Sequence, residues 1–413
     1  MLRGTVDRVR FRGASLEGNA LGDPVERELI VYLPPNYEGS GYTGSGDRSR
    51  RYPVVMVLAG FAATNSSLLS FKPWEPNLLE RYERAIELGC GEAIIVLPDC
   101  FTRLGGSQYL DSPAQGNYQS YLADDVLPWV DKHYCTLPQR GARAIVGKSS
   151  GGFGALRMGM DRPDQFAVIG SHAGDCGFEL CLRPRFAEVA AIYERHGGAD
   201  GFLRHIDAQG SPRSQGEFHA LELLALAHAY APIAQSSLSA RTASESPSVR
   251  NLGELPFDPY TALIVPEKWA RWLAHDPALR SIDGLRDARL VFLDAGKSDE
   301  YGLQFGARIL AERLIGSGVA VDHEEFEGGH MGTAYRYDVS LPKIIAALDQ
   351  DSNTHPNTHF FASAPEGALR PTTHPHTHAP SHSPAATAEL DSSVDLTTGP
   401  STSSSAAVAR NAP

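Results

Sequence analysis

The chain has 413 residues, 42% hydrophobic and 21% charged, which is the balance of a globular protein with a sizeable core and excludes a collagen, a coiled coil or a wholly disordered chain. Thirty-seven basic residues against 49 acidic ones leave a net charge of −12, and no basic cluster offsets it, so we expect no nucleic acid among its partners. The longest strongly apolar runs, such as 54–58 and 93–97, are far shorter than the roughly 20 residues of a bilayer span, so we predict no transmembrane helix and no membrane partner.

The amino-terminal segment, residues 1–12, contains four arginines and lacks the apolar stretch of a secretory signal. The five cysteines are irregularly spaced and form no Cys-x-x-Cys pair, so we expect free thiols, with a Cys176–Cys181 bridge as the alternative. Both observations predict a cytoplasmic protein.

Short β-branched runs alternate with amphipathic segments over residues 1–350, which predicts an α/β domain with a mostly parallel central sheet and helices on both faces. The expected strands are 28–33, 53–58, 93–97, 143–146, 166–170, 289–293 and 319–326. Apolar residues at three- and four-residue steps predict helices over 118–133, 153–160, 302–314 and 340–348. The buried stripe expected for the third of these helices is Leu303, Phe305, Ile309, Leu310 and Leu314.

Two stretches break this alternation. Residues 176–287 contain helical patterns around a serine-rich loop at 235–249, which predicts a helical insertion over the sheet. Residues 351–413 are rich in Ser, Thr, Pro, Ala and His and have too few large apolar side chains to offset their ordering entropy, so we expect a disordered tail. The tail holds six of the 15 histidines, and its His-x-His-x-His run at 374–378 can capture a divalent metal, although a solvated low-complexity segment is the simpler interpretation.

A Gly-Lys-Ser-Ser-Gly-Gly segment at 147–152 stands between an expected strand and an expected helix. In that context a G-x-S-x-G pattern is typical of a nucleophile elbow, a strained turn that lifts a serine hydroxyl clear of the sheet. The turn needs small residues two positions to either side of the serine. Gly147 and Gly151 meet this requirement for Ser149, whereas Ser150 would have Lys148 on one side, so Ser149 is the predicted nucleophile.

Serine needs a base and an orienting acid, which follow it in the order acid then histidine in this kind of site. His330 lies in a glycine-rich loop after the last expected strand and is the predicted base. Asp299 lies in the loop after the preceding strand and is the favoured acid, with its carboxylate orienting His330. Asp294, which ends that strand, and Glu300 are the alternatives.

The developing oxyanion needs backbone N–H donors. One is expected from Ser150, next to the nucleophile, and the other from Phe61 in the turn Ala59-Gly60-Phe61-Ala62 after the strand at 53–58.

Two further loops supply candidate pocket residues. Ser107, Gln108 and Tyr109 follow the strand at 93–97 and either line the substrate pocket or belong to a loop ordered by its own hydrogen bonds. His172 is interpreted in the same two ways, as pocket lining or as structure. With Asp175 it forms at most a pair of metal ligands, and because a third ligand at suitable spacing is missing we predict no metal site.

Six motifs follow one another over residues 28–345. They are Val31-Tyr32-Leu33-Pro34-Pro35, Tyr52-Pro53-Val54-Val55-Met56-Val57-Leu58, Gly105-Gly106-Ser107-Gln108-Tyr109, Gly147-Lys148-Ser149-Ser150-Gly151-Gly152, Gly296-Lys297-Ser298-Asp299 and Gly329-His330. In this order they resemble the esterase family of α/β-hydrolases that includes S-formylglutathione hydrolase, feruloyl and enterochelin esterases and the antigen 85 mycolyltransferases. The resemblance implies an α/β-hydrolase fold with Ser149, Asp299 and His330 as triad and with Phe61 and Ser150 as oxyanion donors.

The residues and the resemblance together predict a serine hydrolase without cofactor that cleaves carboxylic ester or thioester bonds of a small-molecule substrate through an acyl-enzyme. An acyltransferase with the same triad is the alternative, because an alcohol can replace water in the second half-reaction. A non-catalytic interaction protein on the same fold is a further alternative, of another class. No oligomeric state is predicted.

Overall fold

The computed structural model describes residues 2–38, 50–233 and 250–348. The predicted tail at 351–413 and the serine-rich loop expected at 235–249 lie outside these residues. No helix of the described chain is both long enough and apolar enough to cross a membrane.

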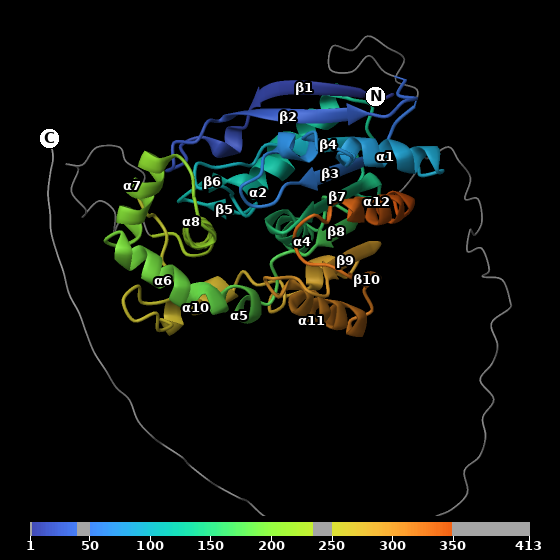
Figure 1. Ribbon diagram of the computed structural model, residues 1–413. Helices are drawn as coiled ribbons and strands as arrows, with labels where there is room; N and C mark the ends of the chain where they lie inside the picture. Colours follow the sequence, from blue (N-terminus) through green and yellow to red (C-terminus); the bar gives the residue numbers. More distant parts are fainter. Residues whose placement is uncertain (1, 39–49, 234–249, 349–413) are drawn as a thin grey trace, which may run out of the picture. The chain divides into compact units, whose positions relative to one another are not determined.

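An eight-stranded sheet forms the centre of the fold, in the order β1-β2-β4-β3-β7-β8-β9-β10 (Figure 1). The strands are β1 (Thr5–Arg12), β2 (Glu26–Leu33), β3 (Val54–Leu58), β4 (Ile94–Pro98), β7 (Arg143–Lys148), β8 (Val168–His172), β9 (Leu290–Gly296) and β10 (Val321–Phe326). β2 pairs antiparallel with both β1 and β4, and every other pair in the sheet is parallel. The carboxyl ends of β3, β7, β8, β9 and β10 therefore meet at one edge, where the loops that carry the predicted site residues begin.

Alternate residues of each central strand enter two different cores, as a strand's period of two requires. In β3, Val54, Met56 and Leu58 are buried in the core on one face, while Val55 and Val57 are buried on the other. The first face is covered by α2 (Tyr118–Ser120), α3 (Leu127–His133), α4 (Ser150–Asp161) and α11 (Leu303–Gly316), and the second by α1 (Leu78–Glu87) and α12 (Tyr337–Ala346). The predicted α/β fold with helices on both faces is confirmed.

The described part of the segment between β8 and β9 is helical. Its main helices are α5 (Phe178–Cys181), α6 (Phe186–Arg195), α7 (Ala199–Gln209), α8 (Gln215–Tyr230) and α10 (Pro266–Leu273). They gather beside the sheet in Figure 1 and share a separate core that contains Phe178, Tyr193, Phe202 and Trp272. Helix α8 is buried continuously from His219 to Tyr230, which matches its lack of a polar face.

Three elements differ from the prediction. Strand β1 was not predicted, because its charged residues alternate with Val and Phe. A strand at the edge of a sheet can form with such a half-buried pattern. The helix expected at 118–133 is interrupted by a π-helical turn at Tyr121–Val126, whose wider winding shifts the buried face. In α11, Phe305 and Ile309 are exposed, so two members of the expected stripe face outward.

The strand bounds differ as well. The strand predicted at 166–170 is Val168–His172 in the structure. Backbone bonding to both sides begins one residue earlier, since the Ala167 N–H donates to the Arg143 carbonyl oxygen at 3.0 Å and the Ala167 carbonyl oxygen accepts the Arg289 N–H at 2.8 Å.

The core of the helical segment provides a first test. Trp272 is fully buried and its indole N–H donates to the Glu254 carbonyl oxygen at 3.0 Å, whereas Trp74 is 99% exposed. We expect Trp272→Ala to lower the free energy of unfolding by about 3–5 kcal/mol, because it leaves a cavity and an unpaired acceptor. The matched Trp74→Ala variant should change it by about 0.5 kcal/mol or less. Urea denaturation of both variants measures the difference, and similar losses would show that Trp272 does not hold this core.

Candidate active site

Ser149 occupies the turn between β7 and α4. Its φ of 56° and ψ of −125° lie outside the regions that non-glycine residues favour, and its N–H donates to the His172 carbonyl oxygen at 2.9 Å. A Cβ added to Gly147 would lie 2.4 Å from the backbone of Gly151, and one added to Gly151 would lie 2.3 Å from the Leu58 carbonyl oxygen. No side chain fits at either position, which is the physical reason for the two glycines of the motif.

His330 follows β10 and its ring is oriented by Asp299. Its Nδ1 lies 2.9 Å from Asp299 Oδ2, and both side chains are almost completely buried. The other oxygen of Asp299 accepts the Tyr301 backbone N–H at 2.9 Å. The carboxylate is thus fixed from both sides and leaves Nε2 of the imidazole free to face a substrate.

The two alternative acids have other partners. Glu300 Oε2 accepts the backbone N–H of His330 at 2.7 Å, so Glu300 fixes the loop and not the ring. Asp294 lies 2.7 Å from His172 Nδ1 through one oxygen and accepts from Arg336 Nε at 2.8 Å through the other. Among the three carboxylates, the geometry therefore favours Asp299 as the acid.

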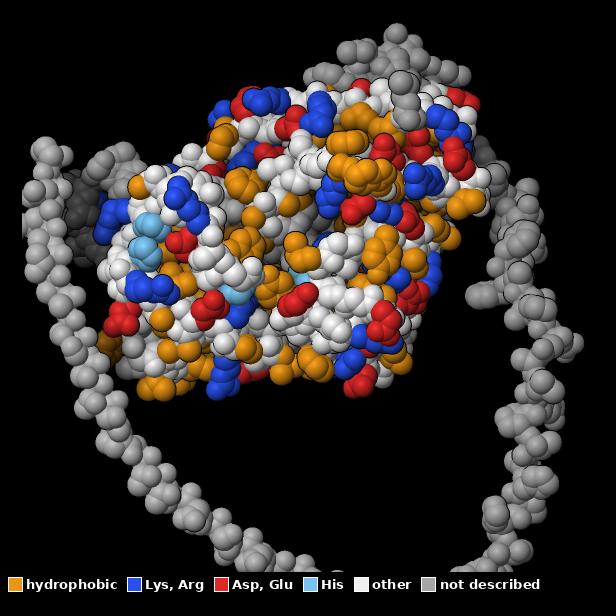
Figure 2. All heavy atoms as spheres, viewed as in Figure 1, with side chains coloured by type: hydrophobic (Ala, Val, Ile, Leu, Met, Phe, Trp, Pro, Cys, Tyr) orange, Lys and Arg blue, Asp and Glu red, His pale blue; other side chains and the backbone are white. Residues whose placement is uncertain are grey.

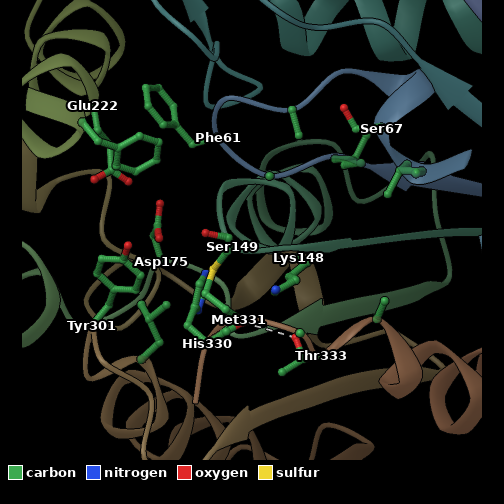
Figure 3. Close-up of a pocket in the computed structure, with 18 of the residues that line it drawn as sticks. Phe61, Ser67, Lys148, Ser149, Asp175, Glu222, Tyr301, His330, Met331 and Thr333 are labelled. Carbon is green, nitrogen blue, oxygen red and sulfur yellow. Dashed lines mark hydrogen bonds between the residues drawn. The ribbon is translucent and has the colours of Figure 1, made fainter. Parts of the chain in front are cut away.

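Ser149 and His330 line the same pocket, which has a volume of about 340 Å³ (Figure 3). Phe61, Asp175, Glu222 and Tyr301 lie to one side of the serine, and Lys148, Ser67 and Thr333 lie to the other. The pocket thus has two compartments, with the serine and the histidine between them.

The turn after β3 runs directly beside the nucleophile. A Cβ added to Gly60 would lie only 3.6 Å from Ser149 Cβ, and the N–H of Phe61 forms no hydrogen bond with any other described residue. Ser150 begins α4, where the first N–H groups of a helix have no helical acceptor. Both predicted donors are therefore placed next to the serine, and their role toward an oxyanion stays a prediction.

The structure corrects the expectation for Ser107, Gln108 and Tyr109. All three are buried and none lines the pocket. Positive φ angles of 51° at Gln108 and 54° at Tyr109 turn this loop inward, where Gln108 donates to Asp175 at 3.0 Å and the Tyr109 hydroxyl donates to the Ala59 carbonyl oxygen at 2.6 Å. These two hydrogen bonds join the loop to Asp175 and to the turn after β3.

His172 is also absent from the pocket wall. Its ring nitrogens lie 2.7 Å from Asp294 Oδ1 and 2.9 Å from Ser340 Oγ, so it is a structural residue behind the nucleophile and forms no ligand pair with Asp175. Among the described residues, one group of three possible metal ligands lies together, with ligand atoms within 4.8 Å of one another: His196, His205 and Glu217. His196 directly follows α6, His205 lies in α7 and Glu217 in α8, and none of the three lines the pocket that contains Ser149.

The pocket also contains residues that the sequence analysis did not select. Among them are Asp175, Arg185, Phe218, Glu222 and Tyr301. The four-residue spacing of Phe218 and Glu222 places both on one face of α8, but periodicity alone does not say that this face meets the catalytic loops.

Burial shifts the pKa of two groups in the pocket. Desolvation, followed by the charge of Glu222, raises the pKa of the Asp175 carboxyl to about 6. Desolvation lowers the pKa of the Lys148 ammonium, against the opposing effect of Asp299. The carboxyl and the ammonium lie on opposite sides of Ser149.

A mainly parallel sheet with a serine on a strained strand-to-helix turn, and with an acid and a histidine after later strands, is the architecture of the α/β-hydrolases. The chain belongs to the family described as "Putative esterase", whose model matches residues 19–348.

The chain is also similar to individual known proteins in sequence or in fold. An esterase of Mycobacterium tuberculosis (strain H37Rv) is 28% identical over 150 residues, which are 35% of this chain and 28% of that protein. The chain thus matches less than a third of that relative's length. A ferulic acid esterase structure has a TM-score of 0.50 and 17% identity, covering 84% of this chain and 100% of that one. An S-formylglutathione hydrolase from Agrobacterium tumefaciens has a TM-score of 0.48 and 15% identity, covering 84% and 97%.

The glycine contacts of the elbow generate a second test. Gly151→Ala should destabilise the fold by about 1–3 kcal/mol or more, because its Cβ meets the β3 backbone, and should reduce any ester turnover by displacing Ser149. In Gly316→Ala, where nothing lies within 4 Å of the added atom, we expect a change of about 1 kcal/mol or less. Urea unfolding of the two variants measures both effects. Equal tolerance at the two positions would contradict the close approach of the turn to β3.

Proposed function

We propose that this chain is a serine esterase that uses Ser149, His330 and Asp299 to cleave carboxylic ester or thioester bonds through an acyl-enzyme. The observation that carries the proposal is the juxtaposition in one pocket of a serine on a strained elbow with a histidine whose far nitrogen is held by a buried aspartate.

The proposed reaction starts with Ser149. His330 Nε2 takes the hydroxyl proton while Oγ attacks the carbonyl carbon, and the carbonyl electrons move onto oxygen. The N–H groups of Phe61 and Ser150 donate to that oxyanion. Collapse of the tetrahedral intermediate breaks the bond to the leaving alcohol or thiol, which receives the proton from His330, and Ser149 keeps the acyl group.

Water completes the cycle in the same steps. His330 takes a proton from water as the oxygen attacks the acyl carbon, and then returns it to Ser149 as the acid product leaves. Asp299 orients the imidazole and stabilises the imidazolium during both half-reactions. An alcohol in place of water would give acyl transfer, and the ratio of acid to new ester formed with an added alcohol distinguishes the two outcomes.

The nucleophile is tested by two adjacent serines. Ser149→Ala should abolish turnover of 4-nitrophenyl esters and labelling by a fluorophosphonate, with a Tm within a few degrees of the parent. Ser150→Ala should keep most of its activity, because its proposed role uses the backbone N–H and its buried Oγ has no hydrogen-bond partner. Equal loss in both variants, or labelling that survives Ser149→Ala, would reject the elbow assignment.

The acid is tested by two adjacent carboxylates. Asp299→Asn should lower kcat by roughly 10² to 10⁴, because the amide no longer stabilises the imidazolium. Glu300→Gln keeps an oxygen that can accept the His330 backbone N–H, so a loss of about tenfold or less is expected. Steady-state kinetics of the two variants decide between them. A large loss in Glu300→Gln with little change in Asp299→Asn would exchange the two roles.

A further inference from the structure

The carboxylate of Asp175 lines the catalytic pocket but has no part in the proposed reaction. It lies in the loop after β8 and is only 6% exposed. One oxygen accepts a hydrogen bond from Gln108 Nε2 at 3.0 Å, and the other has no partner among the described residues. A buried carboxylate with an unused acceptor, facing a cavity, is costly unless a ligand completes its interactions.

Asp175 belongs to the compartment that we call acidic, formed by Phe61, Asp175, Arg185, Phe218, Glu222 and Tyr301. Figure 3 shows the carboxylates of Asp175 and Glu222 directed into the space beside Phe61 and Tyr301. The Phe61 and Phe218 rings meet edge to face at 5.4 Å. A neighbouring pocket of about 890 Å³ shares Arg185, Phe218 and Tyr301, so a bulky group has room here.

The charges of the acidic compartment do not cancel. Arg185 forms an ion pair with Glu222, and its guanidinium also lies 5.3 Å from the Tyr301 ring centre. The charge of Arg185 therefore balances that of Glu222. Lys148 lies on the other side of Ser149 in Figure 3. The compartment therefore has one negative charge in excess, that of Asp175.

We propose, as an extension of the esterase function above, that the acidic compartment binds a cationic ammonium group on the part of the ester that enters it. Such a group supplies the missing charge for Asp175, and the faces of nearby aromatic rings attract it as well. A neutral hydroxyl would satisfy only the free acceptor, and an anionic group would be repelled.

The face of the protein shown in Figure 2 carries no charge pattern that would select a cationic ester. On the face shown in Figure 2, acidic and basic side chains are interspersed and no broad patch of one sign is visible. We expect the few groups inside the pocket to discriminate between a cationic and a neutral substrate, because the low dielectric there strengthens the electrostatic interaction of each charge with a ligand.

The experiment compares isosteric ester pairs with the full chain. Acetylcholine and 3,3-dimethylbutyl acetate place the cation or its neutral carbon analogue on the alcohol side. The 4-nitrophenyl esters of 4-(trimethylammonio)butyrate and 5,5-dimethylhexanoate place it on the acyl side. The readout is the ratio of kcat/KM for the cationic ester to that for its neutral partner, which cancels effects common to both.

We expect this ratio to reach about tenfold or more at a pH of about 8 in one of the two pairs, equivalent to about 1.4 kcal/mol. Protonation removes the charge of Asp175, so the preference should be present above its pKa of about 6 and be lost as the pH falls through that value. Because kcat/KM reports the free enzyme, the midpoint should lie close to that pKa.

Other titratable or charged groups lie around Asp175 and could affect the pH dependence of the kcat/KM ratio. They are Cys176, Cys181, Arg185, Glu222, Tyr230 and His330. Burial raises the pKa of Cys176, Cys181 and Tyr230 well above the ordinary values, away from the range tested. His330 is required for both esters of a pair, so its contribution to the rate cancels from the ratio.

Asp175→Asn should bring the ratio near one at every pH. Asp276→Asn is the matched control, since Asp276 is also buried, also has a raised pKa and binds only backbone N–H groups outside the pocket. The control should keep the ratio. The pH profile of the unaltered chain is an independent measurement should Asp175→Asn fail to fold.

The proposal is overturned if neither pair favours the cationic ester at a pH of about 8, if the preference persists below a pH of about 5, or if it survives Asp175→Asn. These failures are distinct from a failure of the proposed function. A chain that hydrolyses the neutral esters through Ser149 without preferring the cations is an esterase whose acidic compartment binds something else. A chain that hydrolyses neither ester of either pair rejects both proposals.

Discussion

Direct backbone contact between the nucleophile turn and β3 is the constraint on which the rest of the site depends. Gly147 pairs in register with Leu58, and Gly151 packs against the Leu58 carbonyl oxygen so closely that no Cβ fits. This contact forces Ser149 to a positive φ and holds the turn that contains Phe61 beside it. Ser149 and the proposed oxyanion donor are thus positioned by sheet register, and sites built on strands and helices are held more precisely than sites on loops.

Two His–Asp pairs lie near the turn that contains Ser149. Their surroundings differ because one aspartate lies within β9 and the other lies beyond its end. Asp294 is inside the strand, paired in register with His172, so that couple is buried and supports the backbone of Ser149 through the His172 carbonyl. Asp299 lies in the loop beyond the strand and reaches the ring of His330, which faces the pocket. The His172–Asp294 pair supports the backbone of Ser149, and the His330–Asp299 pair is the one proposed to take part in the reaction.

Short sequence patterns predicted the features that depend on interactions between residues close together in the chain. The glycines around Ser149 and the runs of β-branched residues predict the elbow and the parallel sheet, since both follow from sterics and burial within a few residues. The inward course of Gln108 depends on a positive φ that composition does not reveal. The position of Asp175 and Glu222 in the pocket of Ser149 depends on how the helices after β8 pack against the loops at the ends of the strands. That packing involves contacts between residues far apart in the sequence.

The buried support of the nucleophile comes from the last described helix. Ser340 of α12 contacts the His172 ring, and Arg336, just before that helix, holds Asp294. Since chains fold progressively from the amino terminus as they are synthesised, the β7 turn emerges long before the residues that lock it. A nascent chain therefore contains Ser149 without its support until almost all of this fold has been made, so the geometry proposed for the reaction forms only late in synthesis.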